Sequence, residues 1–118
     1  MFALVQDADF DHGELYARLK QSADERASGN TGAIVTFTGL VRDFNNAGDI
    51  DGIELEHYPG MTEKALMKLL EQAVVRFSLN SAGALHRVGR IYNNEQIVWV
   101  GAAAQHRQAA FDAASFLM

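Results

Sequence analysis

The 118-residue chain contains no cysteine and only one proline. Without cysteine, its own side chains cannot form a disulfide scaffold, a thiolate-ligated zinc or iron–sulfur site, or a nucleophilic thiol. The chain also lacks a long hydrophobic run, because the longest, residues 97–104, falls far short of the roughly 20 residues that span a bilayer. Residues 1–9 show no basic segment before an apolar stretch, so we expect no secretory signal.

Positive charge is also scarce. Ten Lys and Arg residues stand against 15 Asp and Glu residues, giving a net charge of −5. A field of this sign repels nucleic acid and anionic membranes. The 48% of hydrophobic residues and 21% of charged residues are typical of a globular protein and exclude a disordered chain. We therefore expect a soluble, cytoplasmic protein with a single domain over residues 1–118, and no nucleic-acid or membrane partner.

Hydrophobic periodicity predicts five strands and three helices. We expect strands at residues 1–6, 33–38, 52–58, 84–91 and 96–103, with helices beginning at Asp11 or Asp9, at Thr62 and at Gln105. Strand 96–103 is apolar on both faces, which indicates a central strand covered on both sides. The mixed order, with strands in hairpin-like pairs, favours an α+β fold in which helices pack on one face of a mixed sheet.

Turn signals separate these elements. Residues 80–83 are expected to form a turn, Pro59 to end strand 52–58, and the Gly- and Asn-rich residues 42–51 to form a mobile loop. The helix that begins at Gln105 has no glycine, proline or basic last turn to end it, and it stops in the apolar run 116–118. We therefore expect the natural chain to continue beyond Met118; fraying of the helix is the alternative.

Two cationic positions follow strands. His106 and Arg107 come directly after strand 96–103 and open the last helix, where a bound anion would also meet free backbone N–H groups. Arg42 follows strand 33–38 and Gly39, a residue that permits an unusual backbone angle or a close ligand approach. If the two strands are aligned neighbours, Arg42 and Arg107 can converge on one phosphate. The alternative is that these residues are ordinary exposed surface cations.

The remaining polar residues point to no second site. His12, His57 and His86 lack the spacing of a zinc site, so we expect no metal and no cofactor. His57 is expected to be a half-buried strand residue. Glu54 and Glu56 share a strand face and are expected to be solvated carboxylates. Arg87 and Arg90 are expected to extend the positive patch or to pair with those glutamates. The chain contains no Ser–His–Asp set, phosphate-binding loop or dinucleotide fingerprint.

Three segments carry a resemblance to a known family. They are residues 32–42 (Gly-Ala-Ile-Val-Thr-Phe-Thr-Gly-Leu-Val-Arg), residues 55–65 (Leu-Glu-His-Tyr-Pro-Gly-Met-Thr-Glu-Lys-Ala), and residues 86–91 together with 98–107, which end in His-Arg. In this order they resemble the large, catalytic subunit of molybdopterin synthase. The resemblance extends from about Gly32 to Met118.

The resemblance implies an α/β hammerhead-like fold and a homodimer that binds a ubiquitin-like small subunit at each end. It implies a sulfurtransferase in molybdenum cofactor biosynthesis, which moves two sulfurs from the small subunit's C-terminal thiocarboxylate tail to cyclic pyranopterin monophosphate. The family's substrate pocket corresponds here to Leu40, Val41, Arg42, His106 and Arg107. Among these, His106 and Arg107 are the catalytic candidates.

The sequence departs from the family pattern at two places. Leu40 stands where a lysine is common in the family, and the chain ends at Met118 before the family's lysine-containing segment, which holds its main catalytic lysine. We expect the 118-residue chain to keep its dimer but to lose most activity. Two alternatives remain: a non-catalytic homodimeric module that binds a phosphate metabolite, and a structural partner that recruits another protein through a sheet edge.

Overall fold

The computed structural model describes residues 1–43 and 51–118. Along them follow β1 (Phe2–Gln6), α1 (His12–Arg26), β2 (Ala33–Leu40), β3 (Gly52–Leu55), α2 (Met61–Phe77), β4 (Ser81–Arg87), β5 (Gly89–Tyr92), β6 (Gln96–Ala104) and α3 (Arg107–Leu117). This is one strand more than predicted, because the single strand expected at 84–91 divides into β4 and β5. Most of the loop expected at 42–51 falls on residues 44–50, which lie outside the described residues.

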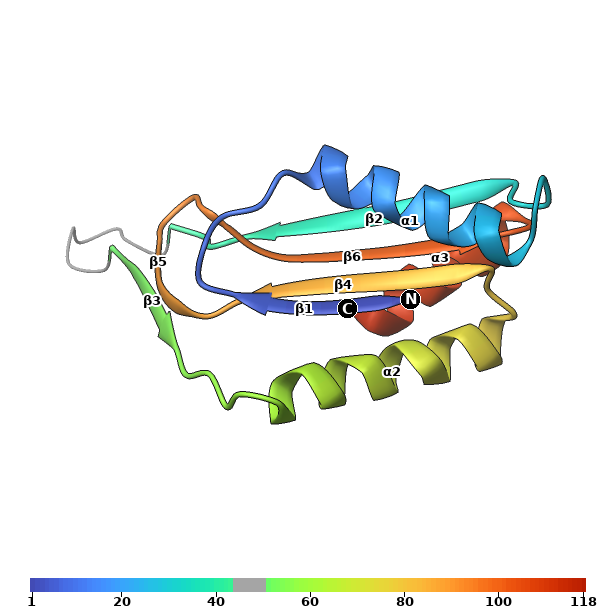
Figure 1. Ribbon diagram of the computed structural model, residues 1–118. Helices are drawn as coiled ribbons and strands as arrows, with labels where there is room; N and C mark the ends of the chain where they lie inside the picture. The colour runs from blue at the N-terminus through green and yellow to red at the C-terminus, as the bar shows by residue number, and fades with distance from the viewer. Residues whose placement is uncertain (44–50) are drawn as a thin grey trace.

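The main sheet has four strands in the order β1-β4-β6-β2 (Figure 1). β1 runs parallel to β4, whereas β6 pairs antiparallel with both β4 and β2. A separate antiparallel pair, β3 and β5, extends from one end of the main sheet. The predicted α+β class with a mixed sheet is confirmed, and β6 takes the interior position that its apolar sequence predicted.

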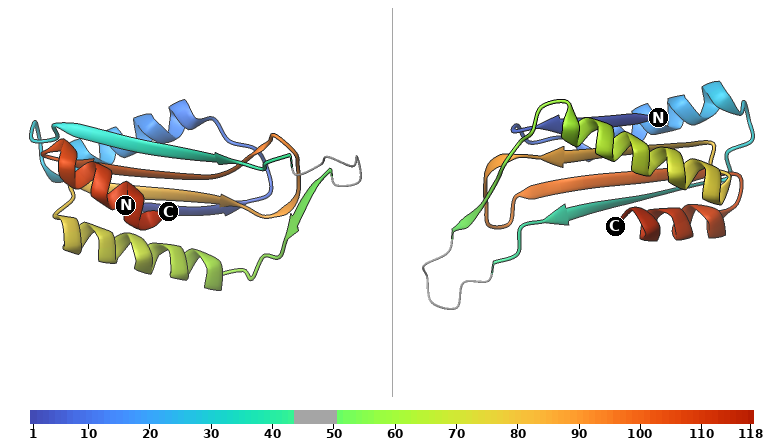
Figure 2. Two further views of the ribbon diagram at one scale, coloured as in Figure 1. Left: turned by 180° about the vertical axis from the view of Figure 1, so that it is seen from behind. Right: turned by 90° about the horizontal axis from the view of Figure 1, so that it is seen from below.

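The helices cover both faces of the main sheet, so the prediction of helices on one face is wrong. α1 packs on one face, and α2 and α3 lie on the other (Figure 2). On that second face α2 contacts β1 and β4, and α3 contacts β6 and β2. The cause is visible in β6, where both sets of alternating side chains are apolar and each set needs its own cover.

The α1 face contains the large core residues. Leu19 of α1 packs on Trp99 of β6, and the Trp99 ring stacks on Phe2 with 5.9 Å between ring centroids. Two glycines make room for these rings. A Cβ on Gly101 would lie 2.6 Å from the Trp99 ring, and one on Gly83 would lie 2.5 Å from the Phe2 ring. Glycine at these positions therefore lets the sheet accept two stacked aromatic side chains.

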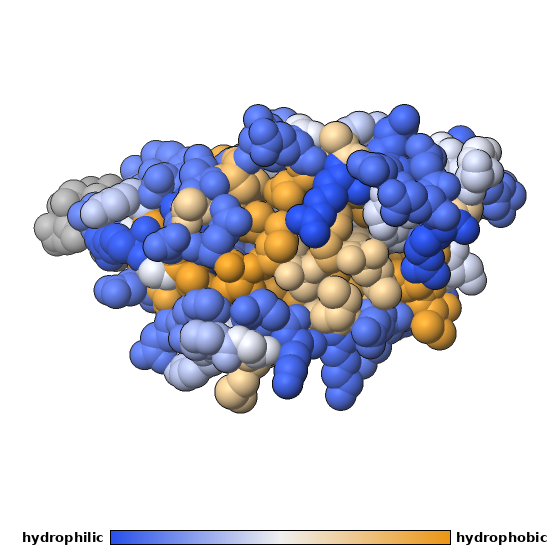
Figure 3. All heavy atoms as spheres, viewed as in Figure 1, coloured by the Kyte–Doolittle hydropathy of each residue, from blue (hydrophilic) through white to orange (hydrophobic). Residues whose placement is uncertain are grey.

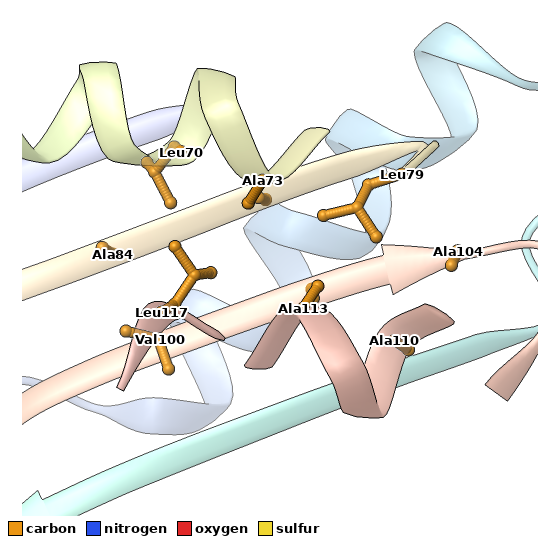
Figure 4. Packing of buried hydrophobic residues seen from close by; sticks show 11 residues of the cluster. Leu70, Ala73, Leu79, Ala84, Val100, Ala104, Ala110, Ala113 and Leu117 are labelled. Carbon is orange, nitrogen blue, oxygen red and sulfur yellow. The ribbon is translucent and has the colours of Figure 1, made fainter. Parts of the chain in front are cut away.

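Small side chains dominate the opposite face, as Figure 4 shows for the packing of α3. Ala110 and Ala113 of α3 face the strands, where Ala102 and Ala104 of β6 are also fully buried or nearly so. Because alanine adds only one carbon beyond the backbone, the helix axis approaches the sheet closely. This close approach fixes the height of the start of α3 above the sheet.

The predicted helix starts are partly correct. Asp11 caps α1 as expected, and its carboxylate accepts hydrogen bonds from the N–H groups of Gly13 and Glu14. The prediction of Thr62 as the cap of α2 is wrong. The N-cap is Gly60, two residues earlier and with a φ of +81°, and the Thr62 hydroxyl donates back to the Tyr58 carbonyl. A left-handed glycine replaces the side-chain cap here.

Two strand boundaries also differ from the prediction. The turn expected at 80–83 is wrong, because Ser81 already begins β4 and is fully buried against Ser22 of α1. β3 ends at Leu55, four positions before the proline expected to stop it. Strand β2 continues to Leu40, beyond the predicted end at Thr38.

In the space-filling view, hydrophobic residues gather between α1 and α2, over edge strand β1 (Figure 3).

Within the described part of the chain, no helix is both long enough and apolar enough to cross a membrane.

Candidate functional site

The first half of the candidate site is the end of β2. Leu40 is 55% exposed, Val41 is buried and Arg42 is exposed. The Val41 backbone is held on both sides, because its N–H donates to the Glu95 carbonyl at 2.9 Å and its carbonyl accepts from the Asn94 N–H at 2.7 Å. The Arg42 side chain therefore starts from a fixed backbone.

A β-bulge lies directly before this segment. Gly39 pairs with Val98 and Leu40 pairs with Gln96, so one residue of β6, Ile97, has no counterpart in β2. A bulge of this kind bends the strand that carries the extra residue, here β6, and shifts its pairing with the neighbouring strand, here at Leu40 of β2. The expectation of an unusual backbone angle at Gly39 is wrong, because its φ is not positive. What glycine permits there is a close approach, since a Cβ would lie 2.7 Å from the Val98 side chain.

The second half is the junction of β6 and α3. His106 is the N-cap residue of α3, with extended backbone angles (φ −125°, ψ 147°) and no capping hydrogen bond from its side chain. Both His106 and Arg107 are exposed. Since no side-chain cap occupies the first turn, its N–H groups and the positive end of the helix dipole are available to an anion. His106 therefore opens the last helix as predicted, and anion binding by its first turn stays a prediction.

Backbone contacts hold this junction in place. The Gly32 N–H donates to the Ala104 carbonyl and the Asn80 N–H donates to the Ala103 carbonyl, at 2.9 and 2.8 Å. The Asn80 side-chain amide donates to the Thr31 hydroxyl at 2.8 Å. A Cβ on Gly32 would lie only 2.1 Å from the backbone oxygen of Gln105, so only glycine fits there.

The two halves lie at opposite ends of the sheet. β2 and β6 are neighbours, but they run antiparallel, with Ala33 opposite Ala104 and Leu40 opposite Gln96. At about 3.4 Å per residue, the ends of β2 are on the order of 24 Å apart. Arg42 and Arg107 of one chain therefore cannot hold one phosphate, and the convergence considered from the sequence is wrong within a single chain. Their individual roles stay predictions.

The other titratable residues are engaged elsewhere. Among the described residues, no group of His, Asp and Glu could hold a metal ion. His86 Nδ1 lies 2.6 Å from the Arg87 carbonyl oxygen, and Arg90 pairs with Asp51 and not with a glutamate. His57 is exposed beyond the end of β3, 3.4 Å from Glu63, so its expected half-buried strand position is wrong.

Asp9, near the Arg42 half of the candidate site, has a carboxyl pKa that differs from the ordinary value. The pKa of Asp9 is lowered, first by the hydrogen bond that its carboxylate accepts from the Gln96 side-chain amide and then by the bond from the Phe10 N–H. Further away, the hydrogen bond that Tyr58 donates to Glu56 raises the pKa of the phenol. Asp9 thus stays ionised at the end of the sheet where Arg42 lies.

Arg87 and Gln96 are the residues that sequence reasoning missed. Arg87 was expected to extend the positive patch or to pair with Glu54 and Glu56, but it is buried and its guanidinium donates to the backbone carbonyls of Asp7 and Gln96. The signal was present in the sequence. The segment 81–87 is otherwise small and apolar apart from Ser81 and His86, and an arginine that closes such a strand has few routes to solvent.

Comparison with known proteins gives consistent results. The family described as MoaE protein matches residues 5–118. A molybdopterin synthase catalytic subunit from Pseudomonas aeruginosa is 50% identical over 115 residues, which are 97% of this chain and 73% of that protein. The solved structure of molybdopterin cofactor biosynthesis protein E from Burkholderia multivorans is 40% identical and superposes with a TM-score of 0.86, over 99% of this chain and 73% of that one.

A more distant structure shares the fold. It is a complex of subunits 1 and 2 of molybdopterin-converting factor from Helicobacter pylori, 18% identical, with a TM-score of 0.73 over 96% of this chain and 72% of that one. Family match, sequence identity and fold agree, and the chain therefore belongs to the MoaE family, whose curated relatives are molybdopterin synthase catalytic subunits.

Proposed function

We propose that this chain is the large subunit of a molybdopterin synthase, which transfers two sulfurs from a thiocarboxylated small subunit to cyclic pyranopterin monophosphate. Membership of the MoaE family supports the activity. The H. pylori relative, a complex of two subunits, supports the small ubiquitin-like partner. Because the chain has no cysteine, the transferred sulfur has to arrive on another molecule. A thiocarboxylate suits a reducing compartment, and we propose the cytoplasm.

The observation that carries the site proposal is the position of β2 at the edge of the main sheet. Two copies that align their β2 edges antiparallel about a two-fold axis bring the end of one β2 beside the start of the other. His106 and Arg107 lie next to the start of β2, since Ala33 is opposite Ala104. In such a homodimer, Arg42 of one protomer and Arg107 of its partner meet at one site, twice per dimer.

Each residue then has a distinct role. The guanidinium groups of Arg42 and Arg107 bind the substrate phosphate as planar forks, and they stabilise negative charge that develops during sulfur transfer. His106, exposed at the start of α3, exchanges a proton with the oxygen leaving group. Leu40 and Val41 form the wall between these cations, with the exposed Leu40 side chain against the pterin.

A lysine beyond Met118 belongs to the same proposal. This chain matches 73% of the length of the P. aeruginosa relative. We expect that attaching the C-terminal segment of that relative after Met118 raises the synthase rate at least about a hundredfold, the lower end of what general acid–base catalysis contributes. An equal rate for the two forms would contradict the role of the lysine and leave the phosphate site unaffected.

Product formation tests the activity itself. The purified chain, with and without that C-terminal segment, is mixed with a thiocarboxylated small subunit and cyclic pyranopterin monophosphate, and the dithiolene product is measured. Arg107→Ala should abolish product, whereas Arg26→Lys, an exposed residue of α1, should not change it. If every form binds the pterin and none makes product, the chain is a non-catalytic phosphate-binding homodimer and the proposed function is wrong.

Mixed dimers test whether the site spans two protomers. Arg42→Ala and Arg107→Ala chains, separated and re-associated at equal amounts, should recover roughly a quarter of the wild-type number of tight substrate sites, because half of the dimers are mixed and each has one intact site. Calorimetric titration with the cyclic pterin counts these sites. No recovery on mixing would show that both arginines act within one chain, which would overturn the shared site.

A further inference from the structure

Arg87, the last residue of β4, is a buried cation with no ion-paired carboxylate among the described residues, and its charge acts on the Asp9 carboxylate only from beyond contact distance. Its exposed fraction is 5%, and no Asp or Glu of the described residues forms an ion pair with it. Arginine is almost never buried to this extent unless its charge is compensated. Here the compensation comes from backbone oxygens. Its Nε and Nη2 donate to the Asp7 carbonyl at 3.1 and 2.9 Å, and its Nη1 donates to the Gln96 carbonyl at 2.8 Å.

These bonds join three segments at the place where the main sheet ends. β4 leaves the sheet at Arg87, and its neighbour Val88 donates its N–H to the Gln6 carbonyl of β1. Asp7 begins the connection from β1 to α1, and Gln96 is the first residue of β6. The backbone pairing of β4 with β6 stops at His86 and Val98. Beyond that pair, the guanidinium of Arg87 replaces the missing ladder hydrogen bonds between the two strands.

Gln96 connects this junction to the candidate site. It pairs with Leu40 on the far side of the bulge, and the unpaired Ile97 lies between it and Val98. Its side-chain amide also donates to the Asp9 carboxylate at 3.0 Å and to the Phe10 carbonyl at 2.7 Å. The residue is therefore held through both its carbonyl and its side chain, so the bulge of β6 has one fixed shape.

We propose that Arg87 is a positioning residue for the substrate site, which fixes the β6 bulge through the Gln96 carbonyl and thereby sets the direction of Leu40, Val41 and Arg42. Bulges beside functional sites re-aim side chains, and this one shifts the pairing of β6 with Leu40. The inference rests on the proposed function, because it assigns Arg42 to the substrate phosphate. Arg87 acts through other residues and not on the substrate, because it is buried at the end of β4 and β6 lies between β4 and β2, which Arg42 follows.

Arg87→Lys separates positioning from general stability. Lysine keeps the charge but has a single nitrogen, which cannot span the Asp7 and Gln96 carbonyls as the planar fork does. In the complex with the small subunit, we expect about tenfold weaker binding of the cyclic pterin, the effect of one lost charge-assisted hydrogen bond. Arg26→Lys is the matched control, since the same change on the exposed face of α1 should leave the Kd unchanged.

A double-mutant cycle with Arg42→Ala provides the decisive readout. If Arg87 acts through Arg42, the Arg87→Lys change should weaken binding about tenfold in the wild-type background and not at all when Arg42 is already alanine. Equal effects in both backgrounds would show a merely structural role and overturn the proposal. An unchanged Kd for Arg42→Ala alone would instead contradict the proposed function, and the link from Arg87 to substrate would fall with it.

Hydrogen exchange on the unsubstituted complex covers the case in which Arg87→Lys does not fold. The amides of Val41, Asn94 and Val88 all lie at this junction. If the junction unfolds locally as one unit, the three amides should show the same free energy of opening. If the Val41 and Asn94 amides open much more readily than the Val88 amide, the junction does not hold the end of β2. That outcome would overturn the proposal without reference to substrate binding.

Discussion

The two ends of the main sheet carry the two halves of the candidate site, and they are built differently. At the Arg42 end, side chains hold the backbone: Arg87 and Gln96 donate to carbonyls of other segments, and Asp9 accepts from Gln96. At the His106 end, the backbone mainly holds itself, through bonds from Gly32 and Asn80 to the end of β6. The Arg42 end depends on hydrogen bonds from the Arg87 and Gln96 side chains. The His106 end depends on Gly32, which has no side chain.

This difference predicts different responses to substitution. Adding atoms should damage the His106 end most, because its contacts are between main-chain atoms that cannot rotate away. Removing or neutralising a polar group should damage the Arg42 end most, because a buried carbonyl then loses its donor. Each of the following substitutions tests one side of this contrast.

Gly32→Ala should have the largest effect on stability. The new Cβ would lie 2.1 Å from the Gln105 backbone oxygen, so the strand or the start of α3 has to move. We expect a loss of about 3 kcal/mol in the free energy of unfolding, the upper end for overpacking. Urea denaturation measures it, with Gly29→Ala as the control. Gly29 has a φ of +70° but open space around its Cα, so backbone strain alone should cost about 1 kcal/mol.

Gly39→Ala should cost less, about 1.5 kcal/mol, because the new methyl group meets side chains and not backbone. The nearest atom is Cγ1 of Val98 at 2.7 Å, followed by the Phe37 ring at 3.3 Å. The same urea measurement ranks the two substitutions. A loss for Gly39→Ala equal to or above that for Gly32→Ala would show that the Arg42 end is the more tightly packed one, against the contrast drawn here.

The smallest effect concerns acid stability. The hydrogen bonds from Gln96 and Phe10 hold the pKa of Asp9 below its usual value in the unfolded chain, about 4. Its stabilisation is therefore complete above that value and is lost as the pH falls through the lower, folded-state pKa. Because Asp9 is exposed, the contribution stays below about 1 kcal/mol.

Asp9→Asn should make the free energy of unfolding fall less steeply between pH 5 and pH 2. This interval extends from about 1 unit above to about 2 units below the usual carboxyl pKa. Urea midpoints across this interval measure the slope. Asp24→Asn, an exposed residue of α1, is the matched control and should leave the slope closer to that of the unsubstituted chain. If both variants shift the slope equally, the Asp9 contact does not contribute.

Local sequence signals predicted the elements better than their ends. β-Branched and aromatic residues located β2, alternation located β3, and a segment apolar on both faces located β6, while the carboxylate of Asp11 located the start of α1. Thr62 was misleading because a glycine in a left-handed conformation can begin a helix without any side-chain cap. The break between β4 and β5 was missed because it depends on Gly89, whose φ of +80° turns the chain from one sheet into the other.

The site was only half predictable from the sequence. Cations after two strand ends could be found without a structure, and His106 does open a helix as expected. The direction of β2 relative to β6 could not be predicted from the sequence, because the same residues fit a parallel or an antiparallel neighbour. The register of β2 on β6 therefore decided that the two cationic ends lie apart. Arg87 was misjudged, although its place at the end of a small and largely apolar strand indicated burial, because the backbone carbonyls that receive its hydrogen bonds belong to other segments of the chain.

The alanines between α3 and the sheet also limit how this protein can change over evolutionary time. Ala110 and Ala113 have no exposed surface, and both belong to the core cluster between α3 and the sheet. A larger residue at either position would lift the helix and carry His106 and Arg107 with it, away from the position at which we propose that they bind substrate. Selection on the chemistry of this site should therefore act on residues that never touch a ligand, by keeping them small.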